Sequence, residues 1–121
     1  MKFKTLFITF VSVLIVAGLI GGGIYLSRLK RNQTVLNHFS LAEKALNEND
    51  PDKATQHLQI IVQRYGNSVV APKACYLLAK LNFETSNFDS AKHYSELLLK
   101  KYPQSKFVYW ASYYLGEVLL E

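Results

Sequence analysis

Apolar residues are distributed along this chain in two ways. Thr5 to Leu26 is a run of 22 residues without a charged side chain. Beyond this run apolar and polar residues are interspersed, and no segment alternates with a period of two for long enough to predict a strand. The pattern therefore predicts an all-α protein in which a long apolar helix precedes a series of shorter helices.

Turn-forming residues predict where the later helices begin and end. Asp50 is a candidate N-cap with Pro51 at the first helical position, and Gly66 is expected to supply a left-handed C-terminal stop. Asn87 is a second candidate N-cap, and Pro103 ends the helix that follows it. The predicted helices cover about residues 33–47, 51–65, 68–85, 88–102 and 105 to 121. The apolar helix is expected to continue almost without a break into the first of them.

The part of the chain after the apolar run repeats itself with a shift of 37 positions. This shift places Asp52 on Asp89 and Ala54 on Ala91. It also pairs Tyr65 with Tyr102, Ser68 with Ser105, Ala74 with Ala111, Tyr76 with Tyr113, Leu78 with Leu115 and Glu84 with Glu121. A period of this length is typical of stacked helical repeats.

Small residues recur where two helices of one repeat must approach closely. The first helix of each copy carries a leucine and a small residue, and the second carries an alanine. These residues are Leu41-Ala42, Leu78-Ala79 and Leu115-Gly116, then Ala54 and Ala91, with Pro103 after the second copy. They resemble the tetratricopeptide repeat (TPR) over about residues 35–121. The chain departs from that family at Cys75 and Asn82, where aromatic residues are usual.

The resemblance implies an α-solenoid of antiparallel helix pairs behind the apolar helix. Residues 1–31 then form a membrane anchor with basic flanks, and residues 32–121 form a TPR-like domain. This domain holds about two and a half repeats, at 35–68, 72–105 and an incomplete 109–121. Three extra residues between the units, with Tyr-Pro-x-Ser at the junction, make the chain similar to bacterial cell-envelope TPR proteins.

The apolar run is long enough to cross a membrane. A helix of this length extends about 33 Å at 1.5 Å per residue, against about 30 Å for the hydrocarbon core of a bilayer. A cleaved signal peptide is the alternative, with Gly21-x-Gly23 as its cleavage site. The only cysteine is Cys75, far beyond the run, which excludes a lipoprotein anchor. We predict an uncleaved anchor that contacts the lipid bilayer through Thr5 to Leu26.

The orientation of this anchor does not follow from its charges. Lysines precede the run, and Arg28, Lys30 and Arg31 follow it, so the positive-inside rule is nearly tied. By analogy with the envelope proteins, we predict a single-pass protein of the bacterial inner membrane with a periplasmic repeat domain. Cytoplasmic repeats are the alternative.

A small-xxx-small pair, Gly18 and Gly22, lies within the run. Such a pair lets two membrane helices approach closely, which predicts helix packing and a homodimer. The alternative is that glycine is simply frequent in membrane helices.

The net charge of +5 resides in the flanks of the apolar run. From Asn32 onward there are nine Lys and Arg against nine Asp and Glu. No basic stripe remains to follow a phosphate backbone, which argues against nucleic-acid binding.

The side chains that could perform chemistry are few and scattered. His38, His57 and His93 fall on different predicted helices without ligand-like spacing, and they are predicted to be helix-surface residues. Cys75 lies on a predicted buried face, where a lone cysteine behaves as a small hydrophobic residue. We therefore predict no catalytic residue, no cofactor and no metal, and a protein that is not an enzyme.

In the TPR architecture the first helix of each pair lines a concave groove. The resemblance places one row of aromatic residues and rows of polar residues on this face, which suit a peptide or a partner helix. The concave-face residues are Phe39, Glu43, Asn47, Tyr76, Lys80, Glu84, Trp110, Tyr113 and Glu117. The alternative is that Tyr76 and Tyr113 only fill the space between helices.

The last predicted helix is apolar on all sides, and the preceding helices can cover only Ala111, Tyr114 and Val118. Leu115 and Leu119 are then expected to form an exposed apolar docking face. This face predicts either a longer protein or a second chain that docks there. The sequence thus predicts a membrane-anchored TPR scaffold for protein–protein interactions in the cell envelope, in translocation, assembly or envelope maintenance. The alternative is a self-associating structural membrane protein whose repeats mediate homo-oligomerisation.

Overall fold

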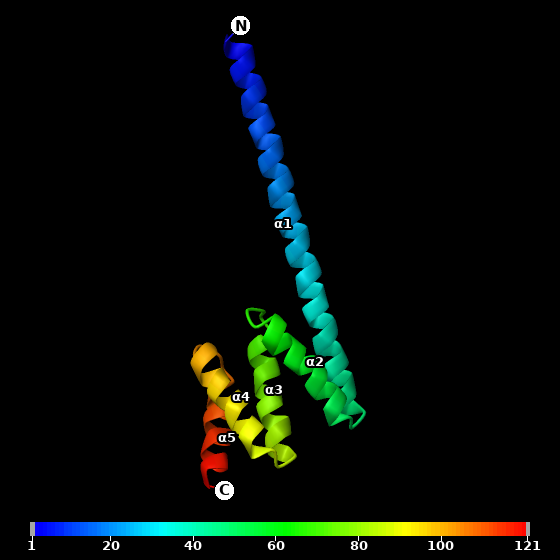
Figure 1. Cartoon of the computed structure of the whole chain (residues 1–121), viewed down its shortest axis with the longest axis vertical. Coiled ribbons are helices and arrows are strands. Elements are labelled where there is room, and N and C mark those ends of the chain that lie inside the picture. The colour runs from blue at the N-terminus through cyan, green and yellow to red at the C-terminus, as the bar shows by residue number, and fades with distance from the viewer. Residues whose placement is uncertain (1, 121) are drawn as a thin grey trace. The chain divides into compact units, whose positions relative to one another are not determined.

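The computed structural model describes residues 2–120, and these residues form five α-helices and no strand (Figure 1). The helices are α1 (Lys2–Asn47), α2 (Pro51–Arg64), α3 (Ala71–Glu84), α4 (Phe88–Lys101) and α5 (Val108–Leu120). The chain divides into two units, one up to Gln33 and one from Thr34 onward, two residues after the predicted boundary. The all-α prediction is confirmed.

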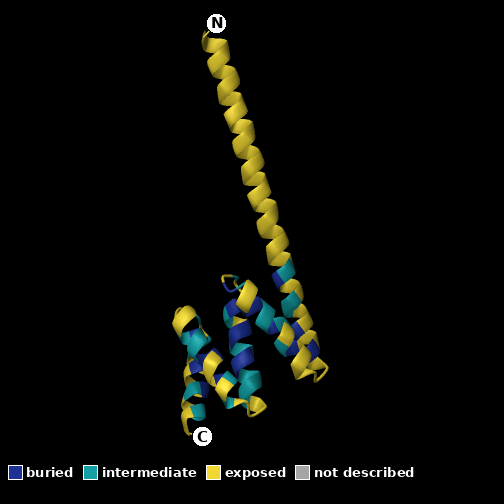
Figure 2. Cartoon of the chain, in the orientation of Figure 1, coloured by how far each residue is buried: buried dark blue, intermediate teal, exposed yellow. Residues whose placement is uncertain are grey.

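In the first unit, the apolar side chains of α1 are exposed throughout (Figure 2). Among the described helices, α1 is the one that is long and apolar enough to cross a membrane, judged by length and composition. The helix also contains the predicted first repeat helix, since it continues to Asn47. The hydroxyls of Thr9 and Ser12 donate to carbonyl oxygens one turn earlier, at 2.8 Å each, which satisfies them without a partner outside the helix.

The second unit repeats its turns as well as its helices. Asn49 and Ser86, which are 37 residues apart, both have positive φ, of 56° and 62°. After each of them an amide donates to a carbonyl five residues earlier, from Asp50 to Ala45 and from Asn87 to Asn82, at 2.8 Å in both turns. This pattern ends a helix with a left-handed residue and caps its last carbonyls. The same turn therefore joins the two helices of each repeat.

The links between repeats also match each other. The amides of Ser68 and Ser105 donate to the carbonyls of Tyr65 and Tyr102, at 2.9 and 3.0 Å. In both links the next helix begins three residues after the serine, so α3 and α5 begin later than predicted. A tight turn at each serine precedes the helix, and the residues of that turn are not part of the helix.

The predicted role of Gly66 is wrong. No glycine in residues 2–120 has a positive φ, so Gly66 does not end α2 in a left-handed conformation. Its lack of a Cβ leaves room for two close neighbours instead. A Cβ at Gly66 would meet the amino group of Lys101 and would lie 3.0 Å from the carbonyl oxygen of Val62. The Tyr102 hydroxyl also donates to the carbonyl of Gly66 at 2.6 Å, which ties the end of one repeat to the end of the next.

The two predicted N-caps differ in what their side chains do. Asp50 precedes α2, and its carboxylate accepts a hydrogen bond from the amide of Lys53 at 3.1 Å, as predicted. Asn87 occupies the N-cap position of α4, but its side chain forms no capping hydrogen bond. The position was predictable from the repeat, whereas the rotamer was not.

The core of the second unit runs through successive helix pairs (Figure 2). The alanines at the recurring small positions, Ala42, Ala54, Ala79 and Ala91, are fully buried. Larger side chains fill the space around them, namely Leu58, Ile61, Leu78 and Leu98, also fully buried. α3 packs against α2, α4 and α5, and α4 also packs against α5. A first helix thus contacts both its own second helix and the first helix of the next repeat, which is the packing of a stacked array.

Candidate protein-interaction surfaces

Phe39, Tyr76 and Tyr113 occupy equivalent positions in the three copies, but their surroundings differ. The Tyr76 ring stacks on Phe107 of the next copy, with centroids 5.0 Å apart and planes 17° apart. It also lies 6.3 Å from the ring of Trp110. Tyr76 therefore contributes to packing between repeats, which is the alternative given above for this residue. It is half-buried, so part of its ring stays accessible.

The aromatic row becomes more exposed toward the last copy. The amino group of Lys73 lies 5.2 Å from the ring centroid of Phe39, and Trp110 occupies the position equivalent to Lys73 against Tyr76. Tyr113 is 49% exposed. Trp110 and Tyr113 contact each other edge to face, at 6.2 Å and 83°. The two rings thus form an exposed aromatic pair on α5.

The polar residues predicted for the concave face are all accessible to solvent. Glu43, Asn47 and Glu84 are exposed, and Lys80 and Glu117 are partly exposed. No residue of these rows is buried, so none is committed to the core. The surface that they form carries both signs of charge.

The last helix leaves uncovered a face that α3 buries. We define the terminal face as Ser112, Leu115, Gly116 and Leu119 of α5. The counterparts of the first three on α3 are Cys75, Leu78 and Ala79, which are fully buried, and the counterpart of Leu119 is Asn82, which is partly exposed. On α5, Ser112 and Gly116 are exposed, Leu119 is 67% exposed and Leu115 is half-buried.

Only one side of α5 is covered by the rest of the domain. Ala111 and Tyr114 are buried and Val118 is partly buried, as predicted for the side that faces the preceding helices. Burial raises the pKa of Tyr114 to about 12, together with the nearby charges of Tyr76 and Glu84 and a hydrogen bond with Tyr76. This hydroxyl therefore stays protonated at neutral pH. On the opposite side, large exposed apolar side chains such as Tyr109 and Leu120 extend the terminal face.

Two of the three histidines predicted to lie on helix surfaces contact each other, and both are half-buried. His38 of α1 and His57 of α2 meet with their Nδ1 atoms 3.1 Å apart, and their ring centroids are 5.4 Å apart. Burial, followed by the charges of His38 and Lys53, lowers the pKa of His57 from its usual value. The predicted helices carried the pair 19 residues apart, and only the rotation of α1 against α2 brings the two rings together.

Cys75 lies in the core, as predicted. Its thiol donates to the carbonyl oxygen of Tyr94 at 3.2 Å, and burial raises its pKa to about 12. A thiol in this state is a poor nucleophile. Within the described part of the chain no group of three or more His, Cys, Asp or Glu could hold a metal ion.

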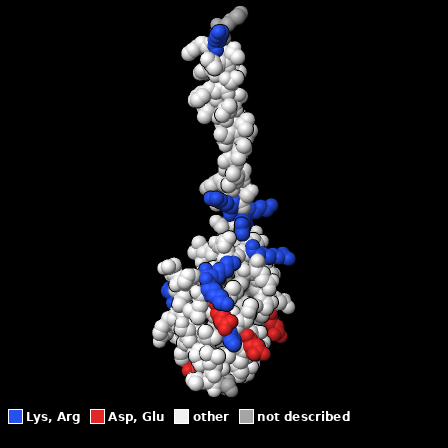
Figure 3. All heavy atoms as spheres, turned by 60° about the vertical axis from the view of Figure 1, so that its left-hand side comes forward, with Lys and Arg blue, Asp and Glu red and all other residues white. Residues whose placement is uncertain are grey.

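The surface of the first unit is uncharged between two basic ends. Figure 3 shows Lys and Arg at both ends of this helix and no charged atoms between them on the visible face. A Cβ added at Gly18 or Gly22 would meet nothing within 4 Å, so the predicted packing face is open along its length.

A comparison with protein families matches residues 28–121 to the family YfiO, described as outer membrane lipoprotein. The chain belongs to this family. No curated protein and no solved structure matches it. The YfiO family and the apolar helix together indicate association with the cell envelope, and the helical repeats suit interaction with other proteins.

The chain differs from the family description in one respect. The family is described as a lipoprotein, but the single cysteine of this chain, Cys75, is buried in the repeat domain. The match begins at Arg28, where the basic flank follows the apolar run, so the run itself lies outside the matched residues.

Proposed function

We propose that this YfiO-family chain is a membrane-anchored TPR scaffold that binds other proteins or peptides in the cell envelope. The observation that carries the proposal is the terminal face of α5. In the previous repeat the equivalent face is fully buried at Cys75, Leu78 and Ala79, and on α5 it is open. Open apolar surface of this kind marks an interaction site.

The aromatic pair beside the terminal face favours a protein partner. Trp110 and Tyr113 are large, rigid side chains that provide much contact area at a small entropic cost. Glu117 lies one turn after Tyr113 and supplies a charged edge. An extended peptide or a partner helix would contact the aromatic pair and the terminal face together. Binding of such a partner serves translocation, assembly or envelope maintenance in this proposal.

The apolar helix acts as the membrane anchor in place of a lipid. Thr5 to Leu26 is free of charged residues and its side chains lie on the helix surface, where a bilayer would cover them. We place the protein in the inner membrane as a single-pass protein with a periplasmic repeat domain. The YfiO family supports a location in the cell envelope, and the choice of the inner membrane is supported by the uncharged apolar run alone.

The function is binding and not catalysis in this proposal. The only thiol, Cys75, is buried with a raised pKa. The only two histidines in contact in the described residues are paired with each other between α1 and α2. Neither arrangement provides a nucleophile with a general base beside it, which catalysis of group transfer would need.

Site-specific photo-crosslinking in cells tests the scaffold function. A photoreactive amino acid at Leu119 should give a protein adduct of discrete mass, and the same residue at Lys92, exposed on α4, should not. Gly116→Leu should abolish the adduct, because a side chain there blocks close approach while a Cβ meets nothing within 4 Å in the chain itself. The proposal would be refuted if position 119 gave no adduct, or if Gly116→Leu left the adduct intact.

Self-association is the second candidate function, and the open Gly18 and Gly22 face favours it. The mass of the detergent-solubilised protein separates the two functions. A dimer that becomes a monomer in Gly18→Leu/Gly22→Leu supports self-association through the anchor. A monomer with and without the substitutions removes it.

A further inference from the structure

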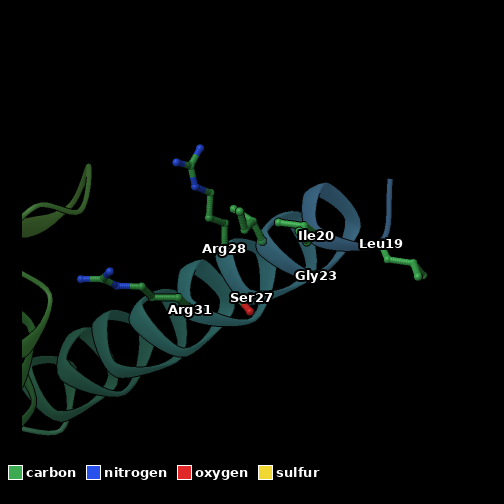
Figure 4. Close-up of a pocket in the computed structure, with 7 residues that line it drawn as sticks. Leu19, Ile20, Gly23, Ser27, Arg28 and Arg31 are labelled. Atoms are coloured by element: carbon green, nitrogen blue, oxygen red, sulfur yellow. The ribbon is translucent and has the colours of Figure 1, made fainter. Parts of the chain in front are cut away.

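A shallow hollow of about 470 Å³ lies on the surface of the first unit, where the apolar run meets its basic flank (Figure 4). It is lined by Leu19, Ile20, Gly23, Ile24, Ser27, Arg28 and Arg31. All of these residues belong to one stretch of α1, so the hollow needs no contribution from another part of the chain. Its apolar end and its cationic end are separated along the helix axis.

The hollow arises from the sizes of residues along two helical rows. Leu19, Gly23, Ser27 and Arg31 follow one another at four-residue spacing, and Ile20, Ile24 and Arg28 form the adjacent row. Gly23 and Ser27 have the smallest side chains of these residues, so the side chains of the first row extend least from the helix at the middle of the row. Nothing lies within 4 Å of a Cβ added at Gly23, which shows that this low point is open. The larger side chains of Ile20 and Ile24 form the wall of the hollow beside it.

The two arginines border the hollow at its C-terminal end. In Figure 4 the side chains of Arg28 and Arg31 extend away from Leu19 and Ile20, so both guanidinium groups lie beyond the apolar part. From Ile20 to Arg28 the helix rises about 12 Å, at 1.5 Å per residue. This distance spans from the hydrocarbon region to the headgroup region of a leaflet when Thr5 to Leu26 crosses the bilayer. Guanidinium groups bind phosphate oxygens in bidentate fashion.

A second copy of the helix would fit this hollow poorly. Pairing here would bring Arg28 and Arg31 of both copies into one interface, where like charges repel. The pair suited to helix packing, Gly18 and Gly22, lies on another side of the helix. Five residues separate Gly18 from Gly23, and at about 100° per residue the two faces are about 140° apart. The charge and the position of the hollow thus favour an anionic amphiphile.

We propose that this hollow binds one anionic phospholipid, with its phosphate between Arg28 and Arg31 and an acyl chain along Leu19, Gly23 and Ile24. The inference rests on the proposed membrane anchor, because a phospholipid reaches this surface only from a bilayer. Juxtamembrane basic residues attract anionic lipids in general. The hollow adds a defined place for the acyl chain, and this makes the binding sensitive to the residue at position 23.

Native mass spectrometry of the full chain, released from phosphatidylcholine vesicles containing a small fraction of phosphatidylglycerol, tests the proposal. The wild type should retain one phosphatidylglycerol in preference to phosphatidylcholine. Each arginine removed in Arg28→Gln and Arg31→Gln should lower this preference about fivefold. Gly23→Leu should also lower it while keeping every charge. Lys2→Gln/Lys4→Gln is the matched control, since it removes two cations from the other end of the run and should change nothing.

Three results would overturn the proposal. One is an equal loss in the lysine control, which would show general surface attraction. Another is an unchanged preference in Gly23→Leu, and the third is displacement of the lipid by inorganic phosphate. Failure of the anchor itself is a separate outcome, detected because the wild-type chain would then leave the vesicles on alkaline extraction.

Discussion

Leu78 and Leu115 are the same position in two successive repeats, and they should differ strongly in what they contribute to stability. Leu78 is fully buried, because the helices packed around α3 enclose it. Leu115 is half-buried, because no helix within residues 2–120 covers the terminal face. Each is a leucine in the interior of a helix, so Leu→Ala changes helix propensity equally at both. The difference between the two substitutions therefore isolates the effect of the missing cover.

The size of this difference follows from the buried side chain. Leu→Ala removes three carbons, worth about 0.8 kcal/mol each when fully buried, and a closed cavity adds to the loss. Leu78→Ala should then lower the free energy of unfolding by about 3 kcal/mol. Leu115→Ala removes a side chain that is partly in solvent already and leaves no closed cavity, so it should cost about 1 kcal/mol.

Urea unfolding of the full chain in detergent micelles, followed by Trp110 fluorescence, measures both values. Trp110 is a suitable probe because it is the only tryptophan and its ring lies near Tyr76 of the preceding repeat. Equal losses at the two positions would refute the reasoning, since they would mean that Leu115 is as enclosed in solution as Leu78.

Three further predictions concern other contacts. Stability should fall as pH decreases below about 6.5, the usual value for histidine, because the lowered pKa of His57 means that the unfolded chain takes up a proton which the folded chain resists. His57→Gln should reduce this fall in a pH series of urea midpoints and His93→Gln should not, so equal slopes would contradict the contribution of the pair. Cys75 should react with iodoacetamide at pH 8 only after unfolding, given a thiol pKa of about 12, and rapid modification of the folded protein would show that it is accessible. Tyr102→Phe should lower the free energy of unfolding by about 1 kcal/mol, because it removes the hydrogen bond to Gly66. Tyr109→Phe at an exposed tyrosine is the control, and equal losses in urea unfolding would show that this hydrogen bond does not stabilise the fold.

The features that follow from local sequence were predictable from the chain, and those that depend on how helices rotate against each other were not. The period of 37 residues placed the helices within a few residues, because turn residues such as Asp50 and Pro51 act within one helical turn. The buried alanines, for example Ala54 and Ala91, followed from the same period. Gly66 was misjudged because the left-handed residues lie elsewhere, and its close neighbours Lys101 and Tyr102 belong to the next repeat, which no local pattern contains.

The candidate surfaces divide in the same way. The exposed side of α5 was predictable, since the preceding helices can cover only one side of a helix that is apolar on all sides. The contact between His38 and His57 was not, because it depends on the angle and depth at which α1 meets α2. The stacking of Tyr76 on Phe107 likewise depends on the link between repeats, whose helix starts three residues after Ser105.

The central claim is an exported repeat domain whose terminal face is covered by a partner. Labelling with a membrane-impermeant maleimide in intact cells tests it most directly, using Leu119→Cys on the terminal face and Lys92→Cys on exposed α4. Buried Cys75 is expected to give little background. The account predicts strong labelling at position 92 and protection at position 119 that is lost when Gly116→Leu is added. Equal labelling at 92 and 119 would contradict a partner on the terminal face, and no labelling at either position until the cells are opened would contradict export.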